Sequence, residues 1–355
     1  MAQNVGTPRF YVSVLQWLDA MGLMEYKEEA IFLSGKNAQQ LVHINPASQG
    51  IITTSNPNAR PYIEFIMHYN TYKRIMPDAN NFSMLLGHNL SHTSTMHQDD
   101  GGYRQTWAAF QTKSHWDAGY DTWFAGSNND TSPTFQNHGT FTHDGFSIAH
   151  GIGGGDAHLA NSAHIRLMFD RLDSDFQYKI GSILYGTFYD MPHSPDLSLK
   201  MSIEMDGVKS ITTKGGSTLS NASYTKPPDW GDMGAWQVGG LYNFRHGRRS
   251  WDLSFSYLSD TDSMATVAGS TNITTDFYDS HYDSQETNTL RLGSDFFSLV
   301  WNRTMGGHLP FVFQPNNSDD TYDQFAICRF DMDSLQYDQV ANNVYNVKLK
   351  IRECW

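Results

Sequence analysis

The chain has 355 residues, a length that suits two domains. Its formal net charge of −13 and its charged fraction of only 17% argue against nucleic-acid recognition, which requires clustered Lys and Arg side chains. The two cysteines, Cys328 and Cys354, provide neither a disulfide framework nor a zinc-ligand pattern, and no apolar run is long enough to span a membrane. Because the first residues also lack the pattern of a secretory signal, we expect the chain to fold in a cytoplasm.

Short apolar runs separated by Gly, Ser, Thr, Asn and Asp predict a fold composed mainly of β-strands. Residues 10–22 are compatible with a helix and equally with a pair of strands. Further strands are predicted in the first half at residues 61–70, 82–89, 107–112 and 163–172. Residues 99–161 are rich in Gly, Asn, Asp and His and are expected to form an ordered loop system at one edge. We place the boundary between two domains within residues 173–186.

A group of histidines suggests a metal site at first sight. His88, His92 and His97 lie within ten residues of one another, but the strand pattern that ends at Gly87 keeps His88 and His92 off a shared helix face. Residues 151–158 are rich in glycine but lack the lysine and the helix that follow a phosphate-binding loop. We therefore expect structural roles for these segments, no bound metal, no cofactor and no catalytic residues.

Two further clusters leave alternatives open. Trp116, Tyr120 and Trp123 lie beside acidic residues, a combination that either stacks on sugars or packs in a core or subunit interface. The acidic residues of segment 316–323 either hold a calcium ion through several oxygens or form a solvated turn.

Alternation with a period of two predicts the strands of the second half. The residues expected to face the core are Leu199, Met201, Ile203 and Met205, then Trp251, Leu253, Phe255 and Tyr257, and in the last strand Tyr345, Val347, Leu349 and Ile351. A single helix is predicted from Ser294, as N-cap, to Met305, with Gly306 and Gly307 as the stop. Its packing face is expected to contain Phe297, Val300, Trp301 and Thr304.

The other face of the last strand is basic. Lys348, Lys350 and Arg352 alternate with its apolar residues in a chain that is otherwise acidic. This face is expected either to meet solvent or to contact a neighbouring subunit, as the lining of a ring or against an acidic surface.

At residues 80–91 the sequence resembles the galactose-binding-like, or discoidin-like, jelly rolls of tailed-phage virion proteins. The resemblance is carried by Gly87, His88, Asn89 and Leu90, which correspond to a fold signature where a strand turns. It implies a jelly-roll β-sandwich domain over residues 1–180, whose end loops bind glycans in some members.

Residues 181–355 resemble the distal-tail and tail-tube family of phage β-sandwich proteins. The resemblance is carried by the segments 248–259, 296–316, 323–331 and 343–354, in that order. It implies an antiparallel β-sandwich with one packed helix, which assembles into a ring of six or three copies and contacts other tail proteins. The two resemblances together imply a non-enzymatic virion protein at the tail tip, baseplate or fibre attachment, assembled in the host cytoplasm. The alternative is a carbohydrate-binding adhesin or tail fibre that recognises a host surface glycan.

Overall fold

The computed structural model confirms a mainly β chain with antiparallel sheets. It describes residues 5–29, 31–46, 48–54, 62–68, 80–88, 95–99, 107–111, 146–150, 162–170, 177–197, 199–204, 209–220, 248–263, 295–319 and 324–354.

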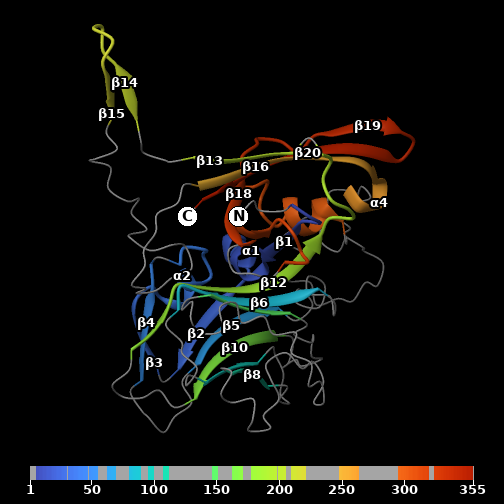
Figure 1. The fold of residues 1–355 in the computed structure, drawn as a ribbon. Helices are drawn as coiled ribbons and strands as arrows, with labels where there is room; N and C mark the ends of the chain where they lie inside the picture. The colour runs from blue at the N-terminus through green and yellow to red at the C-terminus, as the bar shows by residue number, and fades with distance from the viewer. Residues whose placement is uncertain are drawn as a thin grey trace.

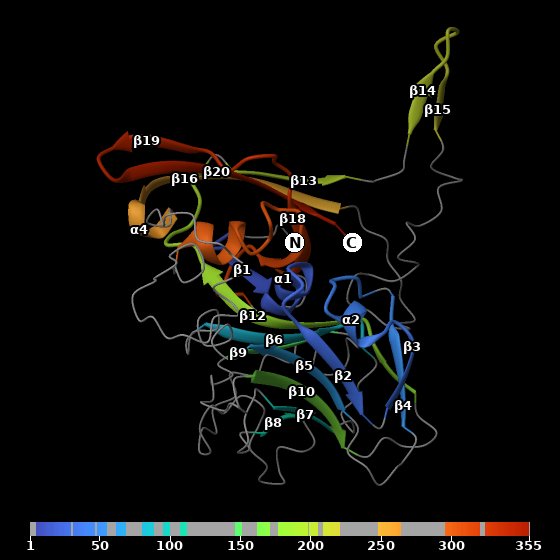
Figure 2. The same cartoon turned by 180° about the vertical axis from the view of Figure 1, so that it is seen from behind.

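A ten-stranded antiparallel sheet forms the centre of the described structure (Figures 1 and 2). Its strands follow the spatial order β13 (Lys200–Glu204), β16 (Arg248–Ser259), β20 (Val344–Glu353), β18 (Ala326–Phe330), β17 (Phe311–Gln314), β1 (Arg9–Ser13), β12 (Ser182–Asp190), β6 (Asn81–Leu86) and β9 (Phe146–His150). The tenth strand, β19 (Tyr337–Ala341), pairs with the first half of β20.

Among the described residues, three smaller sheets and four short helices accompany the main sheet. One sheet contains β2 (Glu25–Glu29), β5 (Tyr62–His68), β10 (Ser162–Asp170), β7 (Thr95–Asp99) and β8 (Trp107–Gln111). Another contains β11 (Tyr178–Ile180), β4 (Gly50–Thr54) and β3 (Ile31–Gly35), and the last is a hairpin of β14 (Ser210–Thr212) and β15 (Thr218–Ser220). The helices are α1 (Val14–Ala20), α2 (Ala38–Leu41), α4 (Asp260–Ser263) and the π-helix η2 (Phe297–Trp301). Within the described ranges, no helix has the length and apolar character needed to cross a membrane.

The central strands of the main sheet are buried on both faces. Side chains of β1 alternate between two cores, because Phe10 and Val12 belong to the first and Tyr11 to the second. The same division separates Phe311 and Phe313 from Val312 in β17. These strands therefore appear in the sequence as continuous apolar runs, and the hydrophobic effect fixes them at the middle of the sheet.

Strands β16 and β20 bury only one face. Trp251, Leu253 and Phe255 join the first core with Val347, Leu349 and Ile351, which confirms the period-two prediction for these six residues. Tyr345, at the start of β20, is only partly buried. The residues that alternate with the six buried ones point to the opposite side, where the lysines of β20 are exposed. The main sheet thus presents an open polar face along β16 and β20.

The main sheet contains strands from both sides of the boundary expected at residues 180 and 181. Strand β1 pairs with β12 and β17, and β6 pairs with β12. The division into residues 1–180 and 181–355 stays a prediction, but the two segments share one hydrogen-bonded sheet. Residues 10–22 combine the two alternatives, since they contain the end of β1 and all of α1, which Ser13 caps.

The predicted helix at residues 294–305 is shorter and has a partly different packing face. The Asp295 carboxylate accepts hydrogen bonds from the backbone amide and hydroxyl of Ser298, and π-helical bonding continues to Trp301. The wider turn of a π-helix changes which side chains point inward. Val300 and Thr304 of the predicted face are buried, whereas Phe297 and Trp301 are only partly buried. Trp301 packs against the first core, where its ring contacts that of Phe330.

Three residues that were predicted to face the core are exposed. In β16 the register shifts between Phe255 and Leu258, and Tyr257 adopts a φ of +63° and faces solvent. This β-bulge breaks the period of two and brings Leu258 inward in its place. In β13 the alternation holds but burial does not, because Met201 and Ile203 remain exposed at the edge of the sheet.

Candidate functional site

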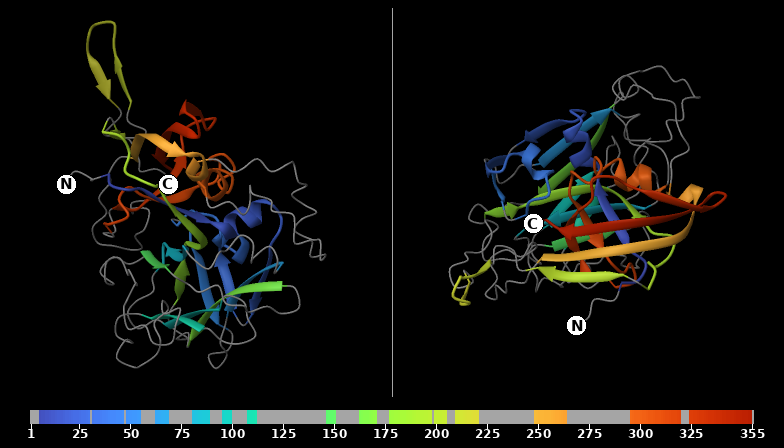
Figure 3. Two further views of the ribbon diagram at one scale, coloured as in Figure 1. Left: turned by 90° about the vertical axis from the view of Figure 1, so that its right-hand side faces the viewer. Right: turned by 90° about the horizontal axis from the view of Figure 1, so that it is seen from above.

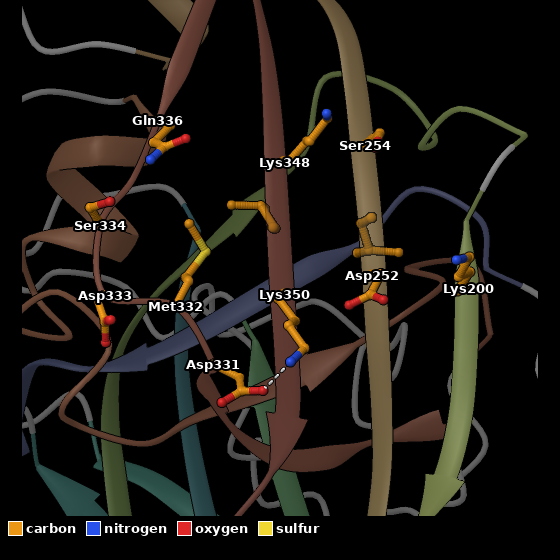
Figure 4. Close-up of a pocket in the computed structure, with 12 residues that line it drawn as sticks. Lys200, Asp252, Ser254, Asp331, Met332, Asp333, Ser334, Gln336, Lys348 and Lys350 are labelled. Carbon is orange, nitrogen blue, oxygen red and sulfur yellow. Dashed lines mark ion pairs between the residues drawn. The ribbon is translucent and has the colours of Figure 1, made fainter.

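The open face of β16 and β20 contains a groove with a volume of about 520 Å³ (Figure 4). Its floor is formed by β20 and β16, β13 lies at one side, and the segment after β18 forms the other wall. Its charged lining residues are Lys200, Lys348 and Lys350, and Asp252, Asp331 and Asp333. Equal numbers of opposite charges make this groove a polar contact surface, in contrast to the purely basic strip that the sequence predicted.

Lys350 is engaged within its own chain. Its Nζ lies 2.6 Å from Asp331 Oδ2, and the backbone amide of Asp331 donates to the carbonyl oxygen of Lys350. The hydrogen bond with Asp331 raises the pKa of Lys350. Because both side chains are about half exposed, at 53% and 43%, the pair contributes only about 0–1 kcal/mol to stability. Its main effect is to hold the wall of the groove against β20.

Arg352, two residues further along β20, also forms an ion pair within the chain. Its Nη2 lies 2.9 Å from Glu204 Oε2 on β13, so this pair links β20 to the edge strand across β16. Sequence reasoning missed both acidic partners, since Glu204 and Asp331 reach β20 only through the sheet order.

Lys348 is the remaining cation of the predicted basic face. Ser254 is its register neighbour on β16, and Figure 4 shows its side chain directed away from Asp331. Among the described residues, the side chain of Lys348 has no hydrogen bond or ion pair. Lys348 is therefore the member of the predicted contact set whose charge is available to another molecule.

The predicted fold signature lies at the end of β6, away from this groove. Gly87 has a φ of +62°, and a Cβ there would lie 2.2 Å from the carbonyl oxygen of Pro46, so both the turn and the close backbone approach require glycine. His88 is buried, and burial lowers the pKa of its imidazole to about 3. This neutral, enclosed histidine fits a structural role. Asn89 and Leu90 lie outside the described residues.

A buried lysine stands beside this turn. Lys36 Nζ donates to the carbonyl oxygens of Asn45 at 2.8 Å and Gly181 at 2.6 Å, and burial lowers its pKa to about 8. Ser182 adds a hydrogen bond to the carbonyl oxygen of His43. These bonds connect the segment around α2 to the start of β12, and no sequence pattern predicted them.

Several other predicted site residues lie outside the part of the chain that the structure describes. Trp116, Tyr120 and Trp123 lie outside the described residues, as do His92, Asp320 and Asp323. Asp319 is described, and its carbonyl oxygen accepts a hydrogen bond from Gln314. In the described part of the chain, no group of three or more His, Cys, Asp or Glu side chains is arranged to hold a metal ion.

Most of the exposed large apolar side chains lie in one stretch of sequence, and two of them, Met201 and Ile203, had been predicted to face the core. Seven large hydrophobic side chains of the described residues are exposed, and five of them fall between residues 197 and 219. These five are Leu197, Met201, Ile203, Ile211 and Leu219. The two others, Tyr257 and Val340, are at other positions in the sheet. The described residues of 197–219, which we call the apolar segment, border the groove through Lys200.

Comparison of the chain with protein-family models, with curated proteins and with solved structures finds no match.

Proposed function

We propose that this protein is a non-enzymatic structural subunit of a tailed-phage particle, which assembles with copies of itself at the tail tip, baseplate or fibre attachment. The phage assignment is supported by the sequence resemblances at residues 80–91 and 248–354. The assembly assignment is supported by the apolar segment, which is the single observation on which the proposal depends.

Concentrated apolar exposure on a folded chain is typical of a surface that another protein covers. Scattered exposure would need no explanation, but here five side chains from one stretch of sequence remain in solvent. Two of them lie on β13, which pairs with β16 and has no other strand partner among the described residues. Open strand edges with apolar side chains pair readily with other chains.

The groove beside the segment supplies the polar rim that subunit interfaces require. Lys348 offers a cation to this rim, and Lys350 and Arg352 form its structured part through Asp331 and Glu204. Such rim charges fix orientation and partner choice more than affinity.

The test is the molar mass of the purified protein, measured by light scattering over a range of concentrations and followed by negative-stain imaging. We expect a closed ring whose mass is six or three times that of the monomer. A protein that remains a monomer at every concentration contradicts the proposal. A monomer that also binds a bacterial surface glycan favours the adhesin alternative.

A further inference from the structure

The hairpin of β14 and β15 stands away from the rest of the described structure (Figures 1 and 3). Within the described part of the chain, its two strands pair only with each other, and every residue from 209 to 220 is exposed. The turn is well formed, because Thr213 and Ser217 exchange backbone and hydroxyl hydrogen bonds and Gly216 takes the left-handed conformation. The hairpin is therefore an ordered arm without a packing surface of its own.

Such an arm lacks the usual source of stability. A two-stranded hairpin is marginally stable in water unless a further strand or surface covers one of its faces. Ile211 and Leu219 are register partners and lie on the same face, with exposed fractions of 69% and 55%. The described arm also carries Lys209 and Lys214 and contains no carboxylate. An apolar face with basic flanks fits an apolar surface on an acidic protein.

Strand β13 offers such a surface. Met201 is the register partner of Trp251, a fully buried residue of the first core, and Ile203 lies two residues further along the same face. The apolar surface of the first core thus continues past β16 and ends uncovered, with Met201 37% and Ile203 60% exposed. The outer edge of β13 has no paired strand among the described residues.

We propose that the β14–β15 arm of one copy docks on the edge strand β13 of a second copy. Ile211 and Leu219 then cover Met201 and Ile203, and the arm extends the main sheet by strand addition. We choose a second copy as the binding partner for two reasons. Its net charge of −13 attracts the basic arm, and each copy supplies one arm and one edge strand. This head-to-tail contact closes into a ring when the rotation permits. The inference rests on the proposed function and names the elements that make the contact.

The first test uses a double variant, Ile211→Asp with Leu219→Asp. Its molar mass is measured by light scattering and compared with that of the wild type. We expect the variant to be monomeric at concentrations where the wild type is assembled, with an unchanged melting temperature of the monomer, since the arm contributes nothing to either core. Val340→Asp is the matched control, because Val340 is also exposed on a β-hairpin but lies outside the apolar segment. This control should assemble like the wild type.

The two outcomes that oppose the inference are distinct. If the wild type assembles and the Ile211→Asp, Leu219→Asp variant assembles equally well, the arm is not the contact, whereas the proposed function stands. If the wild type never assembles, the proposed function fails together with the inference.

The second test locates the arm on its neighbour. Two variants are prepared, and both carry Cys354→Ser. One also carries Ile203→Cys and the other Leu219→Cys, and the two are mixed in the presence of oxidised glutathione. We expect a disulfide-linked pair in the mixture and in neither protein alone, and no such pair when Val340→Cys replaces Ile203→Cys. A single chain that carries both new cysteines and cross-links only within itself would show that the arm folds back, which overturns docking on a second copy.

Discussion

Glu353 holds Arg249 by three hydrogen bonds at the buried end of β16 and β20. Glu353 Oε1 accepts from Nε of Arg249 at 2.9 Å and from its Nη2 at 2.7 Å, and Oε2 accepts from its backbone amide at 2.6 Å. Arg249 Nη2 also donates to the carbonyl oxygen of Phe325. The carboxylate is almost fully buried, with 2% of its side chain exposed. This ion pair lies at the border of the first core, where β16 begins beside the end of β20.

Glu353→Gln should therefore destabilise the fold strongly. An amide presents N–H groups to the guanidinium and leaves its buried charge unpaired, which costs about 3–5 kcal/mol. Glu204→Gln is the matched control, since Glu204 pairs with Arg352 at the surface and its loss should cost about 0–1 kcal/mol. Urea denaturation of both variants measures the difference, and equal effects would show that the Arg249 pair is solvated.

His88 should make the protein sensitive to acid. Because its folded pKa of about 3 lies below the ordinary value of 6.5, the unfolded chain binds a proton that the folded chain excludes. Stability therefore falls as the pH drops below about 6.5, and this loss reaches about 2 kcal/mol at pH 5. His88→Gln removes the titrating group, so its unfolding free energy should decline less between pH 7 and pH 5. If the unfolding free energies of the wild type and of His88→Gln declined equally with falling pH, His88 would have to be in contact with solvent.

The two cysteines should remain thiols. Cys328 belongs to the first core, and Cys354 packs against the second, so their side chains face opposite sides of the sheet. Burial raises the pKa of both thiols, that of Cys354 to about 12. We expect slow alkylation in the folded protein, faster at the partly exposed Cys354, and full modification of both in denaturant without reductant. Mass spectrometry reads the number of adducts, and an unmodified pair would indicate a disulfide.

Lys348→Glu should weaken assembly without changing the stability of the subunit. Lys348 has no ion pair among the described residues, so charge reversal acts on a partner surface and leaves the fold intact. Lys350→Glu is a poorer probe, because it would also place a carboxylate opposite Asp331 and Asp252. The measurement is the concentration dependence of the molar mass, with Lys348→Gln as the neutral comparison. Unchanged assembly of Lys348→Glu would remove this residue from the contact.

The alternation of apolar and polar residues predicted the strands well where the apolar face of the strand lies in a core. Val347, Leu349 and Ile351 are buried as expected, because their face of the sheet packs in the first core. The period also holds in β13, yet Met201 is exposed because only one strand pairs with it. Alternation reports which residues share a face, and it contains no information on whether another layer covers that face.

Partners from distant parts of the chain could not be predicted. Asp331 and Glu204 reach the basic residues of β20 through the order of strands, and Pro46 demands a glycine at position 87 through an approach that only the folded backbone reveals. The bulge at Tyr257 is similar, since its amide donates to the Asn346 side chain on the neighbouring strand. Each of these features depends on the topology of the sheet, which no short window of sequence specifies.

The central position of β1 constrains how this chain is synthesised. The hydroxyl of Tyr11 donates to Gln314 Oε1, a residue that lies 303 positions later in the chain. At about 5–20 residues per second, the ribosome needs roughly 15–60 s to produce the second neighbour of the first strand. During this interval Phe10 and Tyr11 lack half of the environment that later buries them. A premature stop before residue 311 would therefore leave β1 with an open edge of the kind that favours aggregation.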